Sequence, residues 1–174
     1  MRYALTEIED ECRHSKMFAR LISHGGTPWY PVSRAHQNLG RLFKTISTTP
    51  GSFTATLLGE EVLDWMQRLT FPDERVQTLV RGVTRIHVVE EARHVRYARE
   101  EIVRGMAGLT KAELAVHRYQ AGAMAYYVSR TLINPEVYRA VGIDPKVGRK
   151  AALSNPHHQE TMKWSAVCCD AAQG

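Results

Sequence analysis

A long stretch from Asp73 to Met106 contains no proline, and its apolar residues recur at the spacing of an α-helix. Pro72 and Asp73 predict its start, because an aspartate can cap the free amides of the first helical turn. On a helix with 3.6 residues per turn, offsets of four and seven return to the same face. His87, Glu91 and His94 are therefore predicted to share one face of a helix over 73–106.

That face also carries the apolar residues that the helix should bury, among them Val83 and Ile102. A carboxylate removed from water loses several kcal/mol of solvation free energy, and a buried imidazole needs partners for its nitrogens. A cation coordinated by His87, Glu91 and His94 would remove both costs, and this donor set suits iron, manganese or zinc. The alternative is a buried His–Glu hydrogen-bonded pair beside a solvated histidine.

A second Glu-x-x-His motif, Glu11 to His14, lies on the helix predicted over 2–23. Two such motifs on different helices are typical of helical di-metal sites, in which carboxylates bridge or cap two metals. A bridging carboxylate from a third helix is also expected. We favour Glu60 over Glu61, because Asp64 and Arg68 next to Glu61 read as solvent-facing.

The rest of the chain predicts further helices and no sheet, because no stretch alternates with a period of two residues. Thr110 and Glu113 have the spacing of a capping box and predict the start of a helix over 110–132. The other predicted helices span 34–46, 52–69, 135–141 and 156 to about 169. We expect one all-α domain over residues 1–174.

Charge and composition exclude several classes of function. The 23 basic and 18 acidic residues give a net charge of +5, but the arginines alternate with glutamates along helices, so nucleic-acid binding is not expected. No stretch has the roughly 18 apolar residues of a membrane span. Three cysteines without paired spacing favour a reducing, cytoplasmic setting.

The order Glu11-x-x-His14, Glu60, His87-x-x-x-Glu91-x-x-His94 resembles the p-aminobenzoate N-oxygenase (AurF-like) family of non-haem di-iron enzymes. Residues 87–101, 134–138 and 155–158 extend the likeness over essentially the whole chain. The resemblance implies a ferritin-like helical bundle with an elongated central metal-binding helix and two iron ions, with manganese possible. It further implies oxidation of a small aromatic amine toward a nitro compound with O2, through a peroxo-diferric species reset by an external electron donor.

In that family a further terminal carboxylate comes from a helix before the first Glu-x-x-His motif. We therefore expect an N-terminally shortened member, in which Glu7 is the substitute candidate, although a solvated or supporting role suits it better. A missing helix would expose core and favour a homodimer. The alternatives are a non-catalytic ferritin-like metal-binding protein or inactive fragment, and a helical interaction module.

Overall fold

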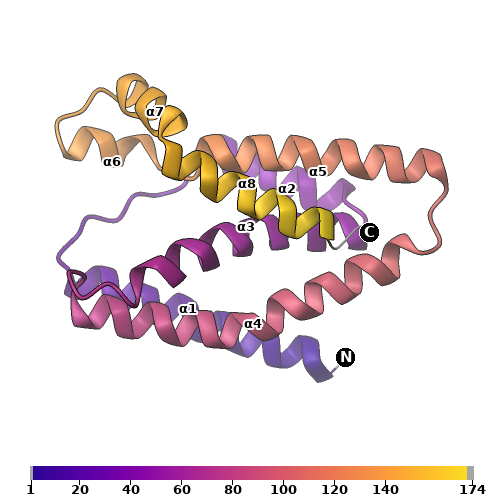
Figure 1. Ribbon diagram of the computed structural model, residues 1–174, viewed down its shortest axis with the longest axis horizontal. Helices are drawn as coiled ribbons and strands as arrows, with labels where there is room; N and C mark the ends of the chain where they lie inside the picture. Colours follow the sequence, from indigo (N-terminus) through magenta and orange to yellow (C-terminus); the bar gives the residue numbers. More distant parts are fainter. Residues whose placement is uncertain (1, 172–174) are drawn as a thin grey trace. The chain divides into compact units, whose positions relative to one another are not determined.

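The computed structural model describes residues 2–171, and the side chains of residues 5–163. Over this part the protein is an all-α helical bundle without strands, which confirms the predicted fold class (Figure 1). α4, with 29 residues, is the longest of the described helices. The helices are α1 (Arg2–His24), α2 (Arg34–Ile46), α3 (Thr49–Thr70), α4 (Thr78–Met106), α5 (Lys111–Thr131), α6 (Pro135–Ala140), α7 (Pro145–Ser154) and α8 (Pro156–Ala171).

Five predicted helix starts, at residues 2, 34, 110, 135 and 156, are confirmed to within one residue. Two, at residues 52 and 73, are wrong, since α3 already begins at Thr49. Thr110 caps α5 with the complete capping box that its spacing to Glu113 predicts. α4, however, begins at Thr78 and not at Asp73. The Asp73 carboxylate accepts hydrogen bonds from the backbone and side chain of Arg75, which closes a separate turn ahead of the helix. Asn134 caps α6 as its position before Pro135 suggests.

Helix α7 is not among the helices predicted from the sequence. The Asp144 side chain caps α7 by accepting hydrogen bonds from the backbone N–H groups of Lys146 and Val147, at 2.8 and 3.1 Å. Gly148 lets α7 approach α6 closely, because a Cβ added at this position would clash with the Tyr138 ring. The cap and the glycine together explain why a short helix forms here.

The chain divides into two compact units. The first unit consists of the residues up to Trp29 and those from Leu63 to Arg96. In it, α1 and the first part of α4 lie side by side and antiparallel, since residues later in α1 contact residues earlier in α4 (Figure 1). Val83 and Val88 are its buried apolar side chains on α4.

The second unit consists of residues 30–62 and those from Tyr97 onward. Its buried core is formed by α3 and the end of α4, with Leu57, Leu58, Val62, Ala98 and Ile102. α3 also reaches α5, where the side chains of Thr54 and His117 lie within hydrogen-bonding distance, 3.2 Å. The expectation of a single domain stays a prediction. Within the described residues, every helix is too short or too polar to cross a membrane.

Candidate metal centre

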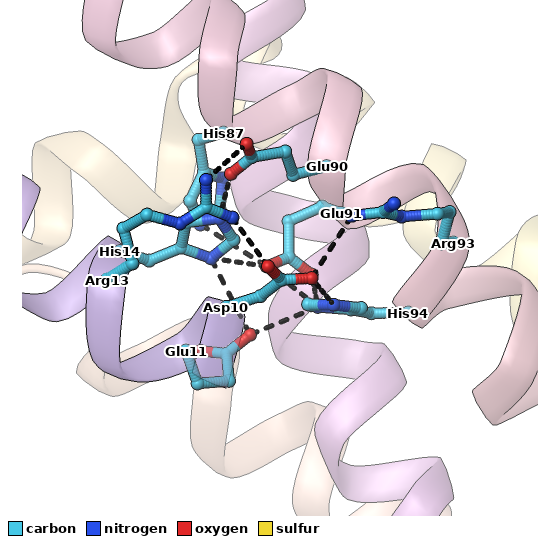
Figure 2. A network of polar contacts seen from close by, with 9 residues as sticks. All are labelled: Asp10, Glu11, Arg13, His14, His87, Glu90, Glu91, Arg93 and His94. Atoms are coloured by element: carbon cyan, nitrogen blue, oxygen red, sulfur yellow. Dashed lines mark hydrogen bonds and ion pairs between the residues drawn. The ribbon is translucent and has the colours of Figure 1, made fainter. Parts of the chain in front are cut away.

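Five of the six predicted ligands lie in the first unit, where α1 supplies Glu11 and His14 and α4 supplies the others (Figure 2). The predicted burial of the α4 face is confirmed: His87, Glu91 and His94 are 6%, 1% and 7% exposed. His14 is 2% exposed, whereas Glu11 lies at the edge of the cluster. Ionisable groups at this depth require partners or a bound cation.

The ligand atoms form two groups that share Glu91. In the first group, Glu91 Oε1 lies 3.0 Å from His14 Nδ1 and 3.6 Å from His87 Nε2. In the second group, His94 Nδ1 lies 3.2 Å from Glu11 Oε1 and 3.2 Å from Glu91 Oε2. Each group offers three donors to one cation, and the shared carboxylate could bridge two cations.

The His14 ring shows why a cation fits the first group. Its Nε2 lies 2.7 Å from Glu90 Oε2, to which it donates a hydrogen bond. In the neutral ring Nδ1 then carries a lone pair, and this buried atom has no hydrogen-bond partner. It faces a carboxylate oxygen of Glu91 at 3.0 Å, a repulsive contact between two lone pairs unless a positive charge lies between them.

His94 is held in the same way from the opposite helix. Its Nε2 lies 3.2 Å from Asp10 Oδ2, so that Nδ1 is directed at Glu11 and Glu91. The residue before each candidate carboxylate ligand thus supports the histidine of the other helix: Asp10 supports His94, and Glu90 supports His14. Such a hydrogen bond fixes the ring and makes the ligating nitrogen more basic.

Two arginines bind these supporting carboxylates, and one of them, Arg13, connects the two acids. Arg13 donates hydrogen bonds to Asp10 at 2.5 Å and to Glu90 at 2.8 Å, and Arg93 donates to Asp10 at 3.1 Å (Figure 2). Burial opposes ionisation of Asp10, but hydrogen bonds from His94 and Arg13 outweigh it and keep the Asp10 pKa below its ordinary value. Asp10 therefore stays an anion and an acceptor.

Sequence reasoning missed these four supporting residues, although a signal for them is present. The two motifs share more than Glu-x-x-His: each reads acid-Glu-x-Arg-His, as residues 10–14 and 90–94. In each motif, the extra acid and the arginine lie on the side of the helix that faces the other motif. Only the antiparallel register of α1 and α4 shows that they cross over.

His87 is adapted to ligate as a neutral ring. Burial, and then the neighbouring His14, lower its pKa to about 4, so that it is uncharged at neutral pH. Its ring lies 4.6 Å from the His14 ring and 5.0 Å from the Phe18 ring, centroid to centroid. The apolar Phe18 ring thus packs against the His87 ring.

The sixth predicted ligand, Glu60, is part of the second unit and is half-buried. The reason given for preferring it to Glu61 is wrong, because Glu61 and Asp64 are 2% and 7% exposed. Glu61 is tolerated at this depth because Arg99 forms an ion pair with it, and Arg68 pairs with Asp64. The assignment of Glu60 as a ligand stays a prediction.

Glu7 lies one turn before Glu11 and close enough to the cluster to interact with His94. Partial burial raises its pKa, while His94 acts in the opposite direction and Glu11 and Asp10 add to the rise. Glu7 is thus a half-buried acid at the border of the centre. Its role as a substitute ligand stays a prediction.

A cavity of about 510 Å³ lies between α1 and α4 in the same unit. Its apolar lining includes Met17, Leu21, Leu79 and Val83, and Arg13 connects its wall to the network of supporting carboxylates. Volumes of this size are typical of small-molecule sites.

Fold and site together define an all-α protein with a buried histidine–carboxylate cluster that could hold metal ions. The family model "P-aminobenzoate N-oxygenase AurF" matches residues 1–170, and the chain belongs to this family of di-iron oxygenase-like proteins. The predicted family resemblance is thereby confirmed.

The chain is also similar to curated mycobacterial proteins that carry no functional description. An uncharacterized protein of Mycobacterium bovis and one of Mycobacterium tuberculosis strain H37Rv are each 28% identical to the chain over 168 residues. Each match covers 94% of this chain and 48% of the relative, so the chain spans about half the length of these relatives. No solved structure matches the chain.

Proposed function

We propose that the protein oxidises a small aromatic amine toward a nitro compound with O2, as a cytoplasmic N-oxygenase with monooxygenase chemistry. Two iron ions, or manganese ions, would be held by His14, His87 and Glu91 and by Glu11, Glu91 and His94. The observation that supports this most directly is the buried, unpartnered Nδ1 of His14, facing Glu91 at 3.0 Å. An external electron donor and a second copy of the chain are partners within the same proposal.

A ferrous pair supplies the electrons that reduction of O2 requires. The protein's own residues prepare the site for this chemistry. Asp10 and Glu90 hold the Nε2–H groups of His94 and His14, so that both Nδ1 atoms are directed at Glu91. Burial of His87 and Glu91 excludes water, and the low pKa of His87 keeps its ring neutral and able to ligate.

The cavity between α1 and α4 suits the substrate that we propose. Leu79 and Val83 form part of an apolar wall for an aromatic ring, and about 510 Å³ holds a small molecule. Lys16 and Arg20 add basic side chains to the lining. We propose that the aromatic amine enters here and directs its nitrogen toward the histidine cluster.

The test is anaerobic loading of the chain with ferrous iron, followed by O2, a chemical reductant and p-aminobenzoate, with products identified by mass spectrometry. We expect hydroxylamine or nitro products from the wild type and none from His87→Ala or Glu91→Ala. His157→Ala, which removes an exposed histidine outside the cluster, should retain activity. Wild-type protein that binds iron but forms no oxidised amine would refute the proposal.

The second candidate is non-catalytic metal binding. The two groups of ligand atoms that share Glu91 support it as well, because holding a cation there requires no reaction with O2. In that case the chain would bind iron, lose it in the Glu91→Ala variant, and produce no oxidised amine under any reductant. Product formation by the wild type excludes this candidate.

A further inference from the structure

A second cavity, of about 770 Å³, lies in the second unit among the end of α5 and the helices α6, α7 and α8. Four basic side chains line it: Arg130 from α5, and Lys146, Arg149 and Lys150 from α7. Its lining contains no acidic residue. None of the residues assigned to the candidate metal centre contributes to it, so this cavity requires a separate explanation.

The basic side chains of this cavity have no acidic partner within its lining. Lys146, Arg149 and Lys150 are three and four residues apart, so they project from one face of α7, where like charges repel each other. Among the described ion pairs, none involves these three residues or Arg130, whose guanidinium lies over the Tyr126 ring at 5.0 Å. An anion bound between the four side chains would remove this repulsion.

Two acids that lie close in sequence to the lining residues have other partners. Glu136 on α6 forms an ion pair with Arg139. The Asp144 carboxylate accepts hydrogen bonds from the backbone N–H groups of Lys146 and Val147. The basic side chains of the cavity therefore remain available to a ligand from solution.

We propose that the basic cavity binds a phosphate-bearing small molecule. A phosphate group carries up to two negative charges and three acceptor oxygens, which suits two arginines and two lysines better than a single carboxylate does. Pro135, Pro145 and Leu153 add an apolar wall that can contact the organic part of a phosphate ester. The volume lies in the range of small-molecule sites.

Isothermal titration calorimetry at about 0.15 M ionic strength tests this with three probes: ADP, inorganic diphosphate and adenosine. We expect saturable binding of ADP at one per chain, and no binding of adenosine. Binding of inorganic diphosphate as tight as that of ADP identifies the phosphate itself as the ligand. Tighter binding of ADP identifies an organic phosphate, because only ADP can use the apolar wall.

The double variant Arg149→Gln with Lys150→Gln should weaken ADP binding about tenfold or more, since it removes two charged hydrogen-bond donors. The control Lys44→Gln with Lys111→Gln makes the same change in net charge at exposed positions outside the cavity and should stay within about twofold. Should the double variant fail to fold by circular dichroism, the single change Lys146→Gln replaces it. Equal losses in variant and control, binding of adenosine, or absence of saturable ADP binding would each overturn the proposal.

Discussion

Replacement of Asp10 by asparagine tests the crossed support of the two histidines most sharply. Asp10 is 7% exposed and accepts hydrogen bonds from Arg13, Arg93 and His94. Asparagine keeps the shape and one acceptor oxygen but loses the negative charge that polarises the His94 ring. We expect the metal position formed by Glu11, Glu91 and His94 to weaken, and the position at His14 to change less.

The size of the effect follows from the contacts that are lost. Loss of a residue that supports a metal ligand lowers metal affinity about 10- to 100-fold, or about 1.4–2.7 kcal/mol. Asp10→Asn belongs near the lower limit because its remaining oxygen can still accept from His94 Nε2. Asp10→Ala belongs near the upper limit, because Nε2 loses its acceptor at a buried site.

The assay is an anaerobic ferrous-iron titration in competition with a chelator, which resolves two binding constants. Glu90→Gln is the mirror experiment and should weaken the position at His14. Glu9→Gln makes the same charge change at an exposed neighbouring position and should leave both constants within about twofold of wild type. Wild-type constants in Asp10→Asn, or an equal loss in Glu9→Gln, would refute the reasoning.

Two further predictions concern the second unit. Burial lowers the pKa of His117 below 6.5, so the unfolded chain binds its proton first as the pH falls. Stability should therefore decrease from pH 7.5 to 5.5, and His117→Gln should reduce this decrease in urea-unfolding midpoints; an unchanged decrease would contradict it. Gly148→Ala should destabilise the protein by about 1–3 kcal/mol, because the new Cβ meets the Tyr138 ring. Gly122→Ala, with nothing within 4 Å, should be neutral or stabilising by up to about 1 kcal/mol in the same urea assay; equal losses would contradict the packing argument.

Much of the candidate metal centre in the first unit could be predicted from helical periodicity. Offsets of four and seven placed His87, Glu91 and His94 on one face, and the structure buries all three. These offsets are local, so they can be read without knowledge of the fold. The relation of Asp10 to His94 depends on the register between two helices, which no local spacing contains.

Burial of individual acids was the least predictable feature. Asp64 and Arg68 next to Glu61 read as solvent-facing, yet Asp64 and Glu61 are both buried, where Arg68 and Arg99 form ion pairs with them. Arg99 lies 38 residues from Glu61, so this partnership could not be read from neighbouring residues. Helix α7 was missed for a related reason: its close approach to α6 at Gly148 is a tertiary contact.

The proposed metal centre requires the Glu91 carboxylate to bind two cations at once. X-ray anomalous scattering at the iron edge, from crystals loaded with ferrous iron, measures this directly. We predict two iron peaks per chain, about 3.5–4 Å apart, on either side of the Glu91 carboxylate. Iron bound only at histidines outside the cluster, or a single peak that does not contact Glu91, would contradict it.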